Sequence, residues 1–123
     1  MEPQGRPPPA DRAYLFGDPV KTYILFGLRN RSIDDARTEI EAALRIQMDP
    51  HESGYHCGAY FRLGRVGAEH FILQKNYDDF EREWTEPDHK KYEVLFYANE
   101  TTRGKEIVSA LANVADVLSA EDL

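Results

Sequence analysis

The fold is decided by residues 55–77, which read YHCGAYFRLGRVGAEHFILQKNY. In residues 55–63, and again in residues 68–77, apolar and polar side chains alternate with the two-residue period of a half-buried strand. Residues 64–67 between them, Gly-Arg-Val-Gly, have the composition of a turn, so the two strands are expected to form a hairpin. A third alternating run, residues 91–98, extends this hairpin into an antiparallel meander.

One further strand and two helices complete the predicted domain. Residues 20–28, VKTYILFGL, are rich in β-branched and aromatic side chains and predict a central strand. Apolar residues at helical spacing predict a helix over residues 32–46, with Ser32 as its N-cap. The same spacing predicts a second amphipathic helix over residues 101–118, capped by one of its two leading threonines.

The order strand, helix, three strands, helix predicts an α+β fold. Each helix has one apolar stripe, so we expect a mainly antiparallel four-stranded sheet with two helices packed on one face. We place this single domain at residues 13–123, after a proline-rich N-terminal arm at residues 1–12. Residues 14–16, Tyr-Leu-Phe, form either a short strand or a hydrophobic anchor ahead of the turn-like Gly-Asp-Pro at residues 17–19.

Charge and cysteine content restrict the partners and the compartment. The 22 acidic and 15 basic residues give a net charge of −7, which disfavours nucleic acid and anionic membranes and favours a basic protein partner. Residues 1–12 lack the apolar core of a secretory signal, and no stretch approaches the roughly 20 apolar residues of a membrane span. Cys57 is the only cysteine and cannot form an internal disulfide. We therefore expect a cytoplasmic protein in a reducing environment.

The residues that most often bind metals or carry catalysis are scattered along the chain. His51, His56, His70 and His89 show none of the spacings typical of a metal site. His56 and Cys57 are neighbours and should point to opposite faces of a strand, with Cys57 among the buried side chains. No glycine-rich phosphate loop leads into either predicted helix. We therefore predict no catalytic residues, no metal site and no cofactor.

The long connection after the second strand of the meander is the main candidate for a binding surface. Residues 78–88, DDFEREWTEPD, hold six acids and one base and contribute −5 of the net charge of −7. Long connections with aromatic residues among charges are typical of protein interfaces. The alternative is that the tryptophan only closes the end of the core while the acids keep the loop solvated. The predicted partner-binding residues are Tyr77, Asp78, Asp79, Phe80, Glu81, Glu83, Trp84, Glu86 and Asp88.

The second half of the chain combines a strand, an acidic loop, a strand and the start of a helix. Its segments are FILQKNYDD at residues 71–79, EPD at 86–88, YEVLFYAN at 92–99 and a Thr-Thr pair at 101–102. Together they resemble the C-terminal half of small bacterial immunity proteins, which neutralise the toxins of polymorphic or contact-dependent systems. The resemblance implies a small, acidic, non-enzymatic protein that binds a toxin near its active site and blocks it.

These patterns predict a non-catalytic, immunity-protein-like inhibitor that occludes the active site of a basic toxin, such as a nuclease, with residues 78–88. The alternative is a small-molecule enzyme or ligand-binding domain on the sheet face that the helices leave open. A pocket with convergent histidines and tyrosines would favour this alternative, whereas a convex acidic surface would favour the inhibitor. The residues that could gather on the open face are Tyr23, Tyr60, Tyr97, His56 and His70.

Overall fold

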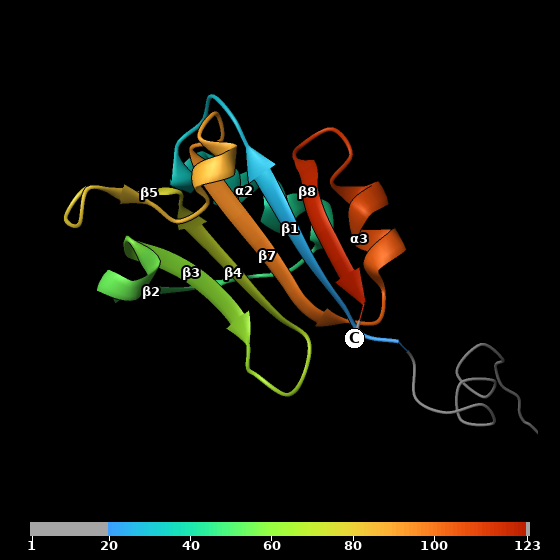
Figure 1. The fold of residues 1–123 in the computed structure, drawn as a ribbon. Helices are drawn as coiled ribbons and strands as arrows, with labels where there is room; N and C mark the ends of the chain where they lie inside the picture. The colour runs from blue at the N-terminus through green and yellow to red at the C-terminus, as the bar shows by residue number, and fades with distance from the viewer. Residues whose placement is uncertain (1–19, 123) are drawn as a thin grey trace, which may run out of the picture.

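The computed structural model describes residues 20–122, in which a six-stranded antiparallel sheet carries two helices and a separate two-stranded hairpin (Figure 1). The strand order in the sheet is β2-β3-β4-β7-β1-β8, and β5 pairs with β6 in the hairpin. The proline-rich arm and the possible anchor at residues 14–16 lie outside the described residues. The elements are β1 (Thr22–Leu28), α2 (Ile33–Leu44), β2 (Asp49–Ser53), the 3-10 turn η1 (Gly54–His56), β3 (Gly58–Gly64), β4 (His70–Lys75), β5 (Tyr77–Asp78), β6 (Glu83–Trp84), the 3-10 turn η2 (Pro87–His89), β7 (Val94–Thr101), α3 (Gly104–Ala110) and β8 (Asp116–Asp122).

The predicted meander and the internal position of β1 are confirmed. β3 pairs with β4, β4 with β7 and β7 with β1, all antiparallel, and the partners Phe61, Leu73, Phe96 and Phe26 stand opposite one another in turn. The ring of Phe96 lies 5.9 Å from that of Phe26 and 5.6 Å from that of Phe71. This row of aromatic side chains forms the centre of the core on one face of the sheet.

Both helices cover that same face, as predicted. Ser32 caps α2 by accepting a hydrogen bond from the backbone N–H of Asp35 at 3.1 Å. Ala36 and Ile40 of α2 belong to the same buried cluster as the aromatic row, together with residues of α3 and its C-cap. In Figure 1, α2 lies behind the sheet, so the view is onto the face that the helices leave open.

The prediction of four strands was wrong, because two edge strands complete the sheet. β2 pairs with β3, and β3 begins only at Gly58, because the predicted start of that strand forms η1. β8 pairs with β1 where the second helix was expected to continue, and α3 ends at Ala110. Both edge strands are almost entirely exposed, so they lack the apolar alternation that identifies a strand with one buried face.

The segment between β4 and β7 folds back over one end of the open face. Asn76 is fully buried and fixes this segment. Its side-chain amide donates to the carbonyls of His89 and Tyr92, both at 3.0 Å, and its Oδ1 accepts from the backbone N–H of Glu86 at 2.8 Å. Tyr92 in turn packs over Gly27 of β1, where an added Cβ would lie 2.6 Å from the ring. No helix within residues 20–122 is long and apolar enough to cross a membrane.

Candidate functional site

The residues predicted to bind a partner begin with a hairpin that extends away from the six-stranded sheet (Figure 1). β5 and β6 are two residues each, with Tyr77 opposite Trp84 and Asp78 opposite Glu83. The Tyr77 and Trp84 rings lie 5.0 Å apart in an edge-to-face arrangement. Trp84 is half-buried and lies outside the core cluster. The tryptophan therefore stabilises the stem of the hairpin rather than closing the end of the core.

Asp78 builds the turn at the end of the hairpin. Its carboxylate accepts hydrogen bonds from the backbone N–H groups of Phe80 and Glu81, at 3.0 and 3.1 Å. The backbone N–H of Arg82, a residue with φ of 58°, donates to the carbonyl of Asp78 at 2.7 Å. This Asx-type turn holds the residues between the two strands in a defined loop.

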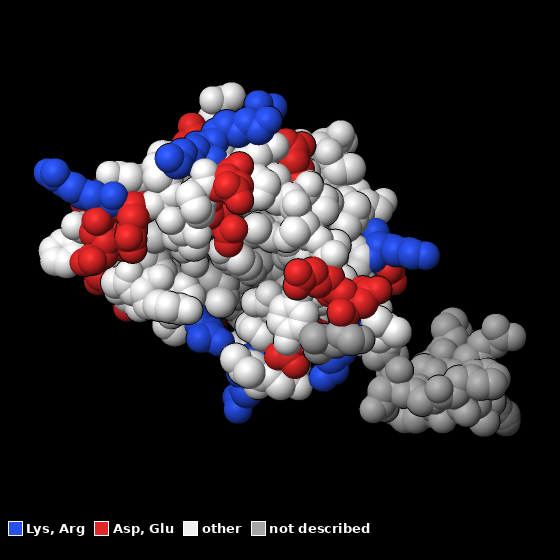
Figure 2. Space-filling model, in the orientation of Figure 1, with Lys and Arg blue, Asp and Glu red and all other residues white. Residues whose placement is uncertain are grey.

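The tip of the hairpin presents an aromatic side chain among acids. The Phe80 residue is 90% exposed. Asp79 forms an ion pair with Lys75 at 3.4 Å, whereas Glu81 and Glu83 are exposed and form no ion pair with any residue from 20 to 122. Figure 2 shows acidic side chains, with a basic side chain beside them, at the end of the molecule from which the hairpin extends, and further acidic side chains elsewhere on this face. An exposed phenyl ring beside exposed carboxylates is suited to contact with a basic protein.

Glu86 and Asp88 follow the hairpin and lie in the segment that packs over the sheet. Asp88 is exposed in η2, whereas Glu86 is half-buried. The hydroxyl of Tyr97 on β7 donates to Oε2 of Glu86 at 3.1 Å. Burial and the neighbouring Glu86 carboxylate raise the pKa of Tyr97, so its hydroxyl remains a neutral donor at physiological pH. Seven of the nine predicted residues therefore lie in the hairpin, Glu86 lies on the open face, and Asp88 lies in η2.

A groove crosses the part of the open face that the segment leaves uncovered. One depression of about 390 Å³ lies between η1 and Glu86, over β4 and β7. A second, of about 230 Å³, lies over β1, β7 and β8. The two share Glu86, Tyr97 and Asn99 and therefore adjoin along β7, and together they are called the groove below. The sequence did not reveal it, because one wall depends on β8 and another on η1, and neither was predicted.

The structure brings together three of the five residues expected on the open face. Tyr23, Tyr97 and His56 line the groove. Tyr60 is buried, with its ring 4.3 Å from that of His56. His70 is also buried, and its Nδ1 donates to the carbonyl of residue 68 at 2.9 Å. These last two therefore do not line the groove, although each contacts a residue that does, Tyr60 through His56 and His70 through Asn99.

Cys57 is buried as expected, but strand parity placed it wrongly. The residue ends η1 with φ of 63°, so it precedes the strand and does not follow its alternation. Its Sγ lies 3.3 Å from Oγ1 of Thr85 and 3.8 Å from Nε2 of Gln74, on the same side of the sheet as His56, whose Nδ1 donates to Oε1 of Gln74 at 2.9 Å. The thiol thus contacts a hydroxyl and an amide rather than an imidazole. Within residues 20–122, no three His, Cys, Asp or Glu side chains are grouped for binding a metal ion.

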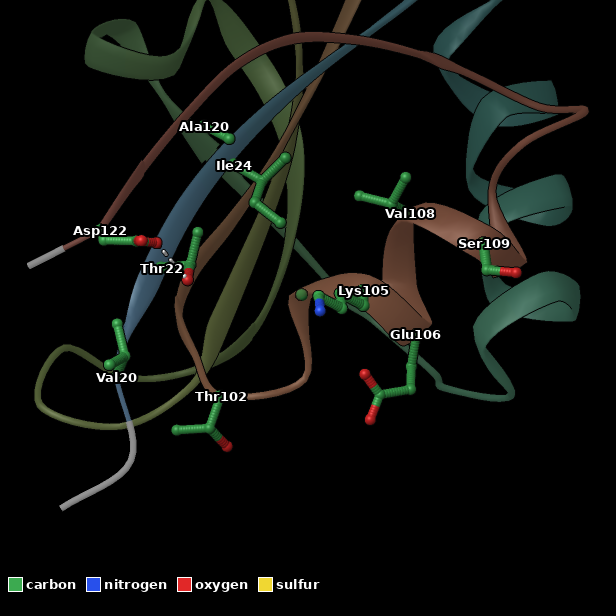
Figure 3. A pocket seen from close by; sticks show the side chains of 11 residues that line it. Val20, Thr22, Ile24, Thr102, Lys105, Glu106, Val108, Ser109, Ala120 and Asp122 are labelled. Carbon is green, nitrogen blue, oxygen red and sulfur yellow. Dashed lines mark hydrogen bonds between the residues drawn. The ribbon is translucent and has the colours of Figure 1, made fainter. Parts of the chain in front are cut away.

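A further depression, of about 610 Å³, lies between α3 and the strands β1 and β8 (Figure 3). Ile24, Val108 and Ala120 supply apolar wall, and Lys105 and Glu106 are charged residues of the lining. It exists because the chain leaves α3 after residue 110 and returns as β8, a strand that was not predicted from the sequence. Thr22 and Asp122, which also line it, are joined by a hydrogen bond of 2.9 Å from the threonine hydroxyl to the aspartate carboxylate.

Comparison with protein-family models, with curated proteins and with solved structures finds no match to this chain, so its function is inferred from the geometry described above.

Proposed function

We propose that this protein is a non-catalytic, immunity-protein-like inhibitor that binds a basic protein, such as a nuclease toxin, through the β5–β6 hairpin. The observation that carries the proposal is the 90% exposure of Phe80 at the tip of an acidic hairpin. Inhibition is by occlusion: the carboxylates meet the Lys and Arg side chains with which a nuclease holds nucleic acid, and the hairpin blocks access to its active site.

Phe80, rather than Trp84, is the anchor of this interface. Trp84 already packs on Tyr77 in the stem, with ring centres 5.0 Å apart, and binding would bury little more of it. A phenyl ring that moves from water into a pocket of the partner contributes about 1.5–3 kcal/mol. The turn held by the Asp78 carboxylate orients this ring before binding, which lowers the entropic cost of association.

The proposal is tested with affinity-tagged full-length chain, expressed in the cells that produce it naturally and purified with its partners. We expect wild type to retain a basic protein whose toxic or nucleolytic activity it inhibits in the purified pair. Phe80→Ala should lose this protein and its inhibition. Val66→Ala should not, although Val66 is also an exposed apolar residue, 80% exposed in the β3–β4 turn.

The purified variants must first give the melting temperature of the wild type, so that lost binding is not lost folding. If Phe80→Ala inhibits the partner as strongly as the wild type does, the hairpin is not the interface. If no basic protein is retained by the wild type, the proposed class of partner is wrong.

A further inference from the structure

The groove on the open face is lined by tyrosine and glutamate side chains. Tyr23 on β1 stands opposite Glu121 on β8, and both line the groove. Tyr97 on β7 lies between the two depressions, with Glu86 above it and Asn99 two residues along the strand. None of the described residues that line either depression is a lysine or an arginine. The groove therefore combines aromatic rings and carboxylates, and no described positive side chain lines it to neutralise them.

The carboxylate of Glu86 is held in a fixed position. The side-chain oxygen of the fully buried Asn76 accepts a hydrogen bond from the backbone N–H of Glu86 at 2.8 Å, and this bond anchors the backbone of Glu86. The Tyr97 hydroxyl donates to Oε2 at 3.1 Å and thereby fixes the side chain. Oε1 receives no hydrogen bond from residues 20–122. A carboxylate that is already oriented loses little conformational entropy when a donor binds its second oxygen.

We propose that this groove binds one alkylguanidinium or alkylammonium group, with its charge on Glu86 and its hydrocarbon stem beside Tyr97 and Tyr23. A carboxylate forms charge-assisted hydrogen bonds with such cations, and aromatic rings attract them. Guanidinium is the better ligand, because it is planar and more weakly hydrated than ammonium and can donate to a carboxylate through two N–H groups at once. Glu121 at the far end of the groove adds a second negative charge.

The source of the cation rests on the proposed function. Glu86 follows β6 by two residues, so a partner held by the hairpin would place its own side chains beside the groove. We therefore assign the groove to an arginine of the basic partner. A free alkylguanidine or amine has the same chemistry, and the experiment separates the two sources.

Binding is measured with ethylguanidinium chloride on the full-length, ¹⁵N-labelled chain by two-dimensional NMR. We expect saturable shifts of the Thr85 and Asn99 signals with a Kd on the order of millimolar, as suits a ligand of so few atoms. N-ethylurea, the neutral analogue, should produce none. Glu86→Gln should weaken binding by about tenfold or more, because it removes the charge and keeps the shape. Asp34→Asn removes one charge from α2, on the covered face, and should leave Kd unchanged.

Equal shifts with ethylguanidinium and N-ethylurea, or an unchanged Kd in a folded Glu86→Gln variant, would overturn the inference without affecting the test of the hairpin. If ethylguanidinium binds and Glu86→Gln also weakens the basic partner, the cation belongs to the partner. If ethylguanidinium binds but the partner's affinity is unaffected by Glu86→Gln, the site takes a free cation, and the assignment to a partner arginine is wrong.

Discussion

Gly27 is the point where β1, β8 and the segment after the hairpin meet. An added Cβ would lie 2.6 Å from the Tyr92 ring and 2.8 Å from Cδ1 of Leu118. Overpacking of this kind costs about 1–3 kcal/mol, so Gly27→Ala should lower the free energy of unfolding by that amount in urea titrations. Gly54→Ala, at a position with open space around it, should change it by less than about 0.5 kcal/mol. Equal stabilities would mean that Tyr92 does not pack over β1.

The lowered pKa of Glu69 predicts how the stability of the protein depends on pH. Burial raises the pKa of Glu69, but hydrogen bonds from Arg103 at 2.9 and 3.0 Å and from Thr101 at 2.7 Å, with the charge of Arg103, bring it below its ordinary value of 4.5. A lowered pKa in the folded state stabilises the protein above pH 4.5, and this stabilisation is lost as the pH falls through the folded value.

The Arg103→Gln variant should therefore raise the pKa of Glu69 in a carboxyl NMR titration. It should also reduce the part of the stability loss that occurs below pH 4.5. Lys105→Gln removes a charge that forms no ion pair within residues 20–122 and should change neither quantity. An unaltered Glu69 titration in Arg103→Gln would show that the ion pair does not form in solution.

Among the elements, those with one buried face were predictable from the sequence. β1, β3, β4, β7 and α2 each carry a regular apolar pattern, and each was found close to its expected position. The prediction of a long second helix was wrong because the spacing of Ile107, Leu111, Val114 and Leu118 fits a helix from residue 107 to residue 118. Only Ile107 in α3 and Leu111 at its C-cap are fully buried. The chain then turns, and β8 pairs with the free edge of β1. Backbone pairing at a sheet edge leaves no periodic signal in side chains that face solvent.

The candidate site was predictable in composition but not in geometry. Acid and aromatic residues singled out the segment from Tyr77 to Asp88. Which residues of this segment form the stem of the hairpin and which lie exposed at its tip depends on β5 and β6. These strands have two residues each and are too short for any periodic pattern. Asn76, which fixes the segment through three side-chain hydrogen bonds, had no signal at all, because a single buried asparagine looks like any loop residue.

For α3 and its C-cap, the loss of stability expected when a side chain is shortened to alanine follows from the burial of that side chain. Leu111 is fully buried in the core cluster, so Leu111→Ala should destabilise the protein by about 2–4 kcal/mol in thermal or chemical melts. Glu121→Ala, on the exposed edge strand β8, should change stability by less than about 0.5 kcal/mol. Small and equal effects would mean that α3 and its C-cap do not cover the sheet.

At the scale of the whole molecule, charge is concentrated where the proposed interface lies. The segment from residue 78 to 88 contributes −5 of −7, so most of the net charge that a basic partner meets lies in the hairpin and just after it. Such a field acts over about one Debye length, roughly 10 Å at 0.1 M salt, and mainly raises the rate of association. The exposed ring of Phe80 acts only after contact and should mainly slow dissociation.

These two roles can be separated with the isolated partner by stopped-flow kinetics. Glu81→Gln with Glu83→Gln should slow association and flatten its dependence on salt, with little change in dissociation, because both side chains are exposed and unpaired among residues 20–122. The control pair, Asp34→Asn with Glu106→Gln, changes the net charge by the same amount but removes one carboxylate from α2 and one from α3. It should leave both rates near those of the wild type. If both pairs slow association equally, net charge steers the partner and the hairpin has no special place in the encounter. If neither does, the partner is not basic at the contact surface, and Phe80 would have to act without electrostatic steering.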